Sequence, residues 1–403
     1  MISPEEAWAR IARELEGRAP RAVALPRREA AGLTLTEALA ARVDVPAADV
    51  SAMDGYALGG GTDPGGEPVP VAGAIRAGDP PGFVLPAGSA VRIMTGAPVP
   101  DGADRVIPVE RTDGGRDRVV FHASAAAGDH IRRRGEIMRR GDPLFPAGAR
   151  LGPGALSLLA THGYGEVPVV RPPSVAILAT GDEVVPPETE PGPGHLRDSH
   201  TDFLLAGCRS FGLAAEPLGI APDRKDELKA RIGRGLAFDV LLLCGGVSMG
   251  EHDLVEGVLD ELGCRIVLDG VAIQPGQPLV FAVHDGGTVF GLPGNPASVM
   301  ACFWLFVRPA LRRWLGVPDG FWHGALAAEL AAPLPGAGGR DRFFAAEVRF
   351  ASGKIRATPR LSRGSHDLAA FALGTALLRV RAGAAPQPAG TPCELLPLGD
   401  WRE

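Results

Sequence analysis

The stretch that most constrains this chain is an apolar run ending in a glycine-rich polar loop, residues 239–253. Five consecutive apolar residues, 240–244, suit a strand buried on both faces. Gly245 and Gly246 follow, and they let the backbone approach a ligand that a side chain would exclude. Open α/β sheets bind ligands in loops at the carboxyl ends of parallel strands, where exposed amides favour anions. The stretch therefore indicates a buried strand leading into a binding loop, with a purely structural strand-to-helix turn as the equal alternative.

The region around this stretch alternates between strand-like and helix-like patterns. Apolar runs typical of strands are found at residues 174–180, 239–244, 265–267, 279–283 and 289–291. Helical spacing of apolar residues is found at residues 199–211, 223–234 and 254–262. Such alternation predicts a mostly parallel sheet with right-handed crossovers and helices on both faces. We therefore expect a three-layer α/β domain over residues 172–317.

The last strand of this domain leads into Gly-Leu-Pro-Gly-Asn-Pro-Ala-Ser (291–298) and then an apolar helix to about residue 315. Asn295 is a natural N-cap and Pro296 a natural first helical residue. Amides at a helix N-terminus attract anions. We expect an anion pocket here, although a purely structural cap would also explain the Asn-Pro pair.

At 403 residues the chain is too long for one compact core, because domains average roughly 150 residues. An N-cap serine, a proline and a glutamate at residues 3–6 predict a helix to about residue 16. Two more helices are predicted at residues 36–42 and 151–163. Short apolar runs between glycine and proline clusters, before residue 142 and again after residue 316, are typical of β domains.

These patterns predict four parts. We expect a discontinuous, elongated helical N-terminal domain (1–48 with 143–171), a small β domain (49–142), the α/β domain (172–317) and a C-terminal β-barrel domain (318–403).

Composition excludes several classes of function. The formal net charge of −6 argues against non-specific nucleic-acid binding, which needs a broad basic surface. Five scattered cysteines without a C-x-x-C pair indicate core residues in a reducing compartment. The longest apolar run, residues 297–307, is shorter than the roughly 18 residues that a membrane span needs, and no signal pattern precedes it. We therefore expect a cytoplasmic protein.

Two segments of the small β domain carry candidate chemistry. In Ser-Ala-Met-Asp-Gly-Tyr-Ala (51–57), Asp54 precedes a glycine, and a simple Asp-Gly turn is the alternative to a functional carboxylate. Five arginines lie within residues 132–140, among them Arg132, Arg133 and Arg134. Guanidinium groups bind phosphate in a bidentate manner, so this segment is a candidate anion patch. A solvated basic loop is the equal alternative.

Taken in order, the chain resembles the molybdopterin molybdotransferases, which complete molybdenum cofactor synthesis and include the C-terminal domain of gephyrin. Six motifs carry the resemblance: Ser-Ala-Met-Asp-Gly-Tyr-Ala (51–57), Arg-Ile-Met-Thr-Gly-Ala-Pro-Val-Pro-Asp-Gly-Ala-Asp (92–104), Ile-Arg-Arg-Arg-Gly-Glu (131–136), Ala-Thr-Gly-Asp-Glu (179–183), Gly-Gly-Val-Ser-Met-Gly-Glu-His-Asp (245–253) and Leu-Pro-Gly-Asn-Pro-Ala-Ser (292–298).

The resemblance implies an α/β domain similar to molybdopterin adenylyltransferase and a homodimer with the active site between subunits. It implies transfer of molybdate into adenylylated molybdopterin, with Mg²⁺ and release of AMP. The upstream adenylyltransferase and acceptor molybdoenzymes are implied as possible partners. Residues with an implied catalytic role are Asp54, Thr95, Glu183 and Asp253, of which Asp54, Glu183 and Asp253 are also candidate metal ligands. Residues with an implied substrate-binding role are Gly245, Gly246, Ser248, Gly250, Asp198, Pro293, Asn295, Pro296, Arg132, Arg133, Arg134, Gln274 and Gln277.

The chain departs from the family pattern at positions that bear charge. Gln274 and Gln277 stand where the family usually has lysines, Ile137 where it has aspartate, and His200 where it has asparagine. A pocket with fewer cations predicts weak use of molybdate, or a preference for tungstate. Gln274→Lys and Gln277→Lys with Ile137→Asp should then lower the molybdate concentration for half-maximal insertion. The alternative is a non-catalytic paralogue that binds and delivers molybdopterin or the finished cofactor.

Overall fold

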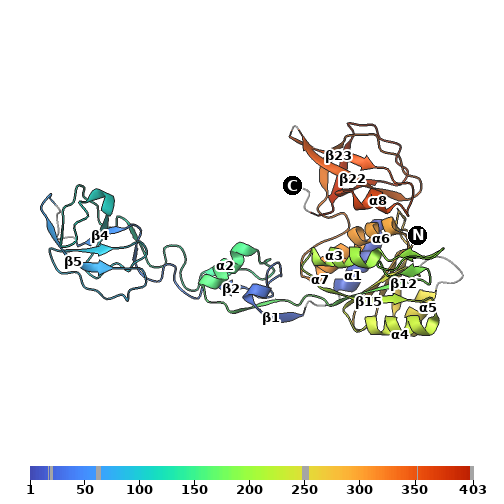
Figure 1. The fold of residues 1–403 in the computed structure, drawn as a ribbon, viewed down its shortest axis with the longest axis horizontal. Coiled ribbons are helices and arrows are strands. Elements are labelled where there is room, and N and C mark those ends of the chain that lie inside the picture. Colours follow the sequence, from blue (N-terminus) through green and yellow to red (C-terminus); the bar gives the residue numbers. More distant parts are fainter. Residues whose placement is uncertain (17, 19–20, 60–64, 247–253, 352, 400–403) are drawn as a thin grey trace. The chain divides into compact units, whose positions relative to one another are not determined.

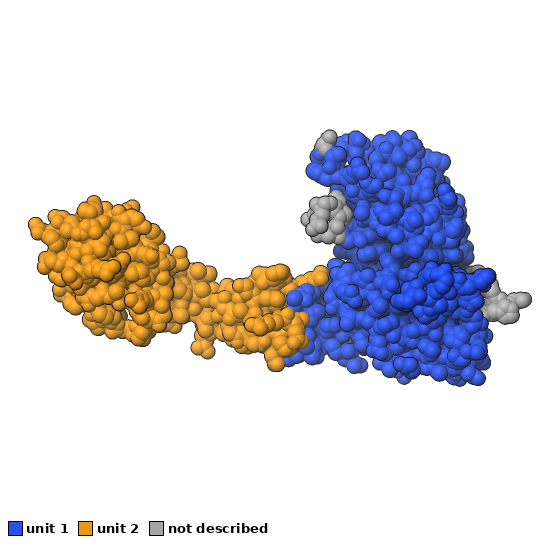
Figure 2. Space-filling view, in the orientation of Figure 1, with its two compact units in different colours: residues 1–25, 30–36, 168–403 blue, residues 26–29, 37–167 orange. Residues whose placement is uncertain are grey.

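The computed structural model describes residues 1–403 except 17, 19–20, 60–64, 247–253, 352 and 400–403. The chain divides into two compact units (Figure 2). Unit 1 comprises residues 1–25, 30–36 and 168–403, and unit 2 comprises residues 26–29 and 37–167. The four-part division expected from the sequence stays a prediction, and unit 1 groups residues 1–25 and 30–36 with the α/β region rather than with residues 143–167.

A six-stranded sheet with the order β15-β12-β16-β20-β19-β17 forms the centre of the α/β part of unit 1. Its strands are β12 (Val175–Thr180), β15 (Ala215–Ala221), β16 (Val240–Cys244), β17 (Arg265–Asp269), β19 (Val280–Val283) and β20 (Thr288–Leu292). The first four strands of this order are parallel, whereas β19 is antiparallel to both of its neighbours. β12, β16 and β20 are buried over their whole length, as unbroken apolar runs require when both faces of a sheet are covered.

Helices cover both faces of this sheet (Figure 1). One face carries α4 (Lys225–Gly235) and α5 (Leu254–Glu261), which share a core with the sheet. The other carries α1 (Pro4–Glu16), α3 (His200–Arg209) and the continuous segment α6 (Pro296–Cys302), η3 (Phe303–Val307) and α7 (Arg308–Trp314). A short strand pair, β13 (Val184–Val185) and β14 (Leu196–Arg197), precedes α3. The predicted three-layer, mostly parallel α/β domain is confirmed.

Five strands close into the predicted C-terminal barrel. They are β21 (Leu326–Leu330), β22 (Asp341–Ala351), β23 (Lys354–Arg360), β24 (Ala376–Val380) and β25 (Pro392–Pro397), and helix α8 (Leu368–Ala372) lies before β24. The order is β22-β23-β21-β25-β24, and β24 pairs back with β22. A sixth strand, β18 (Ile273–Gln274), comes from the α/β part and pairs in parallel with the start of β22. This pairing places Gln274 opposite Arg342.

Unit 2 contains a five-stranded sheet with the order β7-β4-β6-β5-β8. Its strands are β4 (Gly55–Leu58), β5 (Val69–Ile75), β6 (Ala90–Ile93), β7 (Arg105–Pro108) and β8 (Arg118–Val119). Its other elements are η1 (Arg27–Glu29), β2 (Leu39–Ala40), β3 (Val50–Ser51), η2 (Val109–Arg111), β9 (Ile131–Arg132), β10 (Pro143–Phe145) and α2 (Pro153–Thr161). The paired strands β1 (Ala22–Pro26) and β11 (Glu166–Val170) each have residues in both units. The small β domain and the helix near residue 155 were both predicted.

Local sequence patterns misled in a few places. The helix predicted at residues 36–42 is wrong, because Leu39 and Ala40 form a strand that pairs with β10. Pairing with a distant segment outweighs local helix propensity there. β15 was not predicted, since it contains Pro217 and Gly219, which weaken the strand pattern but are tolerated on an edge strand. Among the described residues, no helix has the length and apolar character needed to cross a membrane.

Candidate functional site

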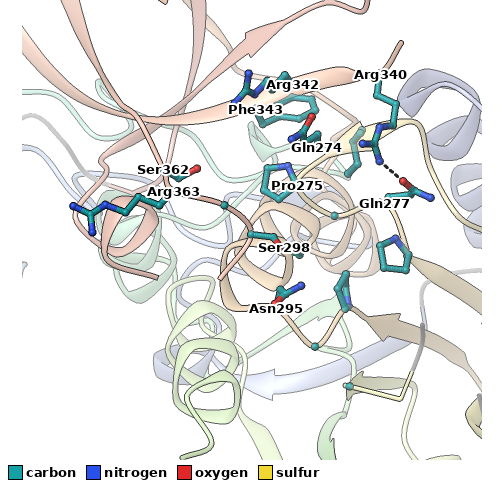
Figure 3. A pocket seen from close by; sticks show the side chains of 18 of the residues that line it. Gln274, Pro275, Gln277, Asn295, Ser298, Arg340, Arg342, Phe343, Ser362 and Arg363 are labelled. Carbon is teal, nitrogen blue, oxygen red and sulfur yellow. Dashed lines mark hydrogen bonds between the residues drawn. The ribbon is translucent and has the colours of Figure 1, made fainter. Parts of the chain in front are cut away.

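A cavity of about 780 Å³ lies where the carboxyl ends of β12, β16 and β20 face the barrel (Figure 3). Loops that follow these three neighbouring strands contribute Glu183, Gly246 and Asn295 to its lining. Residues 340, 342–344 and 362–365 of the barrel and the loop at residues 273–278 line most of the rest. The cavity thus occupies the edge of a parallel sheet at which α/β folds bind ligands.

The glycines after β16 allow a close approach of backbone at this edge. Gly245 and Gly246 have φ angles of +93° and +65°, and a Cβ at Gly245 would lie 2.6 Å from the carbonyl oxygen of Thr180. The Gly245 amide donates to the carbonyl of Leu292 at 3.1 Å, so it is committed to the sheet rather than to a ligand. Gly246 is exposed and lines the cavity. Ser248, Gly250 and Asp253, which the sequence predicts in the same loop, lie outside the described residues.

The start of α6 differs from the predicted anion pocket. The amides of Ser298 and Val299 both donate to the carbonyl of Asn295 at 3.0 Å, and the Ala297 amide donates to Ser365 in the barrel at 3.1 Å. These bonds join the helix to its own cap and to the barrel, so they leave no amide of residues 297–299 for an anion. Asn295 acts as the N-cap through its backbone, and its side chain is exposed at the cavity.

Pro293 and Pro296 occupy different positions around this cap. Pro293 is buried and lines the cavity, whereas Pro296 is the first residue of α6. Both rings restrict the backbone on either side of Asn295. A contact of either proline with substrate stays a prediction.

Barrel arginines supply the positive charge of the cavity. Arg340, Arg342 and Arg363 line it, whereas Glu183 contributes one carboxylate among the described lining residues. Arg340 and Arg342 flank the start of β22 at alternate positions and so share a face of that strand. The Arg342 guanidinium lies 4.6 Å from the centre of the Phe344 ring. Because guanidinium groups match phosphate and other oxyanions, this wall can bind a strongly anionic ligand.

The carboxylate between these arginines does not neutralise them. Asp341 faces away from the cavity, where its Oδ2 accepts a hydrogen bond from Arg379 Nε at 2.7 Å. Its Oδ1 accepts another from the Ala382 amide at 2.9 Å. Sequence reasoning missed Arg340 and Arg342, although a Gly-Gly-Arg-Asp-Arg segment at the start of a strand was a signal for them.

Gln274 and Gln277, which stand where the family usually has lysines, lie next to these arginines. Gln277 accepts a hydrogen bond from Arg340 through its side-chain oxygen (Figure 3). Gln274 is opposite Arg342 in the β18–β22 pairing. The cations that the sequence appeared to have lost from this loop therefore come from the barrel wall beside it.

Asp198 has a structural environment. Its carboxylate accepts hydrogen bonds from the amides of His200 and Thr201 at 2.9 and 3.1 Å and from the Thr201 hydroxyl at 2.5 Å. These bonds fix the first turn of α3 and use both carboxylate oxygens. Asp198 is not among the described residues that line the cavity, so direct binding of substrate by this side chain has no support in its contacts.

In unit 2, Asp54 and Thr95 form a polar pair on the surface. Asp54 Oδ1 accepts hydrogen bonds from the Thr95 amide at 2.6 Å and from the Thr95 hydroxyl at 2.8 Å. These two bonds, the amide first, lower the pKa of the Asp54 carboxyl below its usual value. Gly55 starts β4, where a Cβ would overlap the carbonyl of Ile107. The motif at residues 51–57 thus presents an exposed, ionised carboxylate from a rigid strand end.

Removing the Thr95 hydroxyl should shift the acid limb of the activity. Because the bond from this hydroxyl stabilises the charged form of Asp54, Thr95→Val should raise the Asp54 pKa towards its ordinary value. If activity needs ionised Asp54, it is lost as pH falls through that pKa, so the acid limb moves to higher pH in the variant. The pH profile of the AMP release that the family resemblance implies would measure this, with Thr95→Ser as the control that keeps the hydroxyl. Identical acid limbs for the valine and serine variants would contradict it.

The arginines predicted as an anion patch in unit 2 are largely paired. Arg133 forms an ion pair with Asp49, and Arg134 forms one with Asp44, each at 2.6 Å. The Arg134 amide also donates to Asp49 at 2.8 Å. Arg132 is exposed on β9. Two of the three predicted arginines therefore already have a carboxylate partner, which weakens the case for this patch.

The candidate metal ligands are divided between the units. Asp54 belongs to unit 2 and Glu183 to unit 1, and Asp253 is outside the described residues. Within the part of the chain that the structure describes, no group of three or more His, Cys, Asp or Glu side chains could hold a metal ion. Mg²⁺ often needs only one or two carboxylates, because waters and substrate phosphates complete its octahedron. Exposed, ionised Asp54 fits that donor chemistry.

Family models cover most of the chain. Residues 2–163 match the MoeA N-terminal region (domain I and II), residues 176–313 match a probable molybdopterin binding domain, and residues 327–398 match the MoeA C-terminal region (domain IV). The second match contains the sheet side of the cavity, and the third contains its arginine wall.

Whole-chain comparisons agree. Molybdopterin molybdenumtransferase 2 of Mycobacterium tuberculosis is 34% identical over 395 residues, covering 94% of this chain and 96% of that protein. Molybdopterin molybdenumtransferase of Staphylococcus aureus is 30% identical, covering 90% and 88%. A solved structure described as a molybdopterin biosynthesis moeA protein from Pyrococcus has a TM-score of 0.82 at 30% identity, with all of both chains covered. With its motifs in order along this fold, the chain belongs to the molybdopterin molybdenumtransferase family.

Proposed function

We propose that this chain transfers molybdate into the dithiolene of adenylylated molybdopterin and releases AMP. The observation that carries the proposal is the cavity at the carboxyl ends of three parallel strands, with three arginines against one described carboxylate. Adenylylated molybdopterin carries a phosphoanhydride, and molybdate is a dianion, so both substrates need a cationic wall. A volume of about 780 Å³ suits a ligand of nucleotide size.

The residues divide into substrate-holding and metal-holding groups in this proposal. Arg340, Arg342 and Arg363 bind the phosphoanhydride or the oxyanion, while Gly246 and Asn295 border the ligand from the sheet side. Asp54, with Glu183 and Asp253, would hold Mg²⁺, which neutralises charge on the phosphoanhydride when bound. Thr95 keeps the Asp54 carboxylate oriented and ionised.

A direct assay tests the proposal. Pure protein incubated with adenylylated molybdopterin, molybdate and Mg²⁺ should release AMP in an amount that matches the molybdenum cofactor formed. Omission of molybdate should prevent cofactor formation. Tight binding of the substrate without AMP release would instead favour the non-catalytic paralogue that delivers molybdopterin or the finished cofactor. The same assay with tungstate in place of molybdate decides the oxyanion preference.

We further propose a homodimer in which one subunit supplies Asp54 and its partner supplies the cavity. Support comes from the family resemblance and from the division of the candidate residues between two compact units.

Two variants that are each inactive, Asp54→Asn and Arg340→Gln, should then complement each other after subunit exchange. Random mixing would restore roughly a quarter of the wild-type activity, because half of the dimers are mixed and each has one intact site. Exchange without recovery, or a fully active monomer in sedimentation, would contradict a shared site. The upstream adenylyltransferase and acceptor molybdoenzymes remain proposed partners.

A further inference from the structure

Gln277 is anchored beside Arg340 by its own backbone. The Gln277 carbonyl accepts hydrogen bonds from the amides of Val271 and Leu279, each at 2.9 Å. Its side-chain oxygen accepts a hydrogen bond from an Arg340 Nη1 (Figure 3). Because these bonds fix the backbone of Gln277, its side-chain oxygen has a defined position and orients the Arg340 guanidinium through Nη1. The other guanidinium donors of Arg340 stay available to a ligand.

The charge of Arg340 is preserved in this arrangement. Gln277 is neutral, and Asp341 faces the opposite side of β22, where Arg379 and the Ala382 amide bind it. A carboxylate at position 277 would hold the guanidinium as well but would cancel its charge. A lysine there would have three donors and no acceptor, and would repel the guanidinium. An amide is thus the side chain that orients Arg340 without neutralising it.

We propose that Gln277 is a positioning residue that orients Arg340 towards an anionic group of the substrate. The inference rests on the proposed function. It specifies that a phosphoryl or molybdate oxygen binds to Arg340 on the barrel wall rather than to the loop at residues 274–278. The prediction is opposite to a simple charge count. Gln277→Lys adds a cation to the cavity and yet should weaken anion binding, because it removes the acceptor and displaces Arg340.

Calorimetric titration of the full-length protein tests this with two probes, AMP alone and molybdate alone. For the anion that Arg340 holds, Gln277→Lys should raise the Kd about tenfold, the loss typical of a hydrogen bond with a charged partner. Gln277→Met, which has similar length but no comparable acceptor, should also raise the Kd. Gln387→Lys is the matched control, since it makes the same substitution in the barrel at a residue that does not line the cavity. Its Kd should be unchanged.

A double variant makes the inference sharper. Arg340→Gln alone should raise the Kd at least about tenfold. In Gln277→Lys with Arg340→Gln, the lysine no longer faces a guanidinium and replaces the lost cation, so the Kd should recover part of that loss. Recovery separates positioning from damage to the fold, because a merely misfolded single variant is not rescued by a second substitution. Thermal unfolding of each variant provides a further check on folding.

Several outcomes would overturn the inference. Tighter binding of both probes by Gln277→Lys, which a simple count of charges would predict, contradicts it. Additive effects of Gln277→Lys and Arg340→Gln on the Kd of both probes also contradict it. These readouts are independent of turnover. AMP release by the wild type without coupling between residues 277 and 340 removes the positioning role and leaves the proposed function intact. Coupling in the titrations without AMP release or cofactor formation removes the proposed function and leaves the positioning role intact.

Discussion

Replacing Asp54 by asparagine should reduce AMP release about 100-fold or more, the range expected when a key electrostatic group is removed from an active site. Asparagine keeps an oxygen that can accept the bonds from the Thr95 amide and hydroxyl, so the turn before β4 should keep its shape. Because Asp54 is exposed, the substitution removes no buried contact, and the free energy of unfolding should stay close to that of the wild type. The change therefore isolates the negative charge.

AMP release under saturating substrate measures the effect, with thermal unfolding as the check on folding. Asp79→Asn provides a matched control, because Asp79 is another exposed aspartate of unit 2, accepts a backbone amide at 2.7 Å and lies outside the six motifs. The control should keep wild-type turnover. Near wild-type turnover in Asp54→Asn as well would mean that Asp54 only shapes its turn, which was the structural alternative from the sequence.

The sheet of the α/β part could be predicted because its central strands are continuous apolar runs. β12, β16 and β20 are buried over their whole length, and most of their residues are Val, Leu, Ile, Phe or Ala. Their order in the sheet also places the predicted loops together, since the carboxyl ends of adjacent parallel strands share an edge. This is why Glu183, Gly246 and Asn295 line one cavity.

The arginine wall could not be predicted, because it depends on a pairing between distant segments. Arg342 lies beside the loop at residues 273–278 because β18 joins the barrel sheet and sets Gln274 opposite it. β18 has two residues, too few for a periodic signal. From the sequence alone Gln274 and Gln277 therefore appeared as lost cations, whereas the structure shows arginines beside both.

For Arg133 and Arg134, the sequence predicted available positive charge that the structure shows to be paired. A run of arginines indicates available positive charge only if no carboxylate from elsewhere pairs with it. Their partners, Asp49 and Asp44, precede them by 84 and 90 residues. Local sequence gives the charge of a segment, but its availability depends on which strands and turns the fold brings against it.

Replacing Asp319 by alanine should destabilise unit 1 by about 3 kcal/mol or more, because it leaves buried cations without a partner. The Asp319 side chain is fully buried and forms ion pairs with Arg308 at 3.5 Å and Arg312 at 2.5 Å. Burial already lowers the pKa of Arg308, and Asp319 opposes that effect. Oδ1 also accepts the Gly320 amide at 2.8 Å, so the carboxylate fixes the connection between α7 and the barrel.

Urea unfolding followed by tryptophan fluorescence measures this loss, since the described tryptophans, Trp8, Trp304, Trp314 and Trp322, all belong to unit 1. The control is Glu16→Ala, which breaks the exposed pair of Glu16 with Arg313 and should cost less than about 0.5 kcal/mol. Both substitutions replace by alanine a carboxylate that pairs with α7, with two arginines for Asp319 and one for Glu16, and the buried pairs should account for the larger cost. A cost for Asp319→Ala no larger than the control's would mean that water reaches Arg308 and Arg312 in the variant, and that the buried pairs do not hold α7 to the barrel.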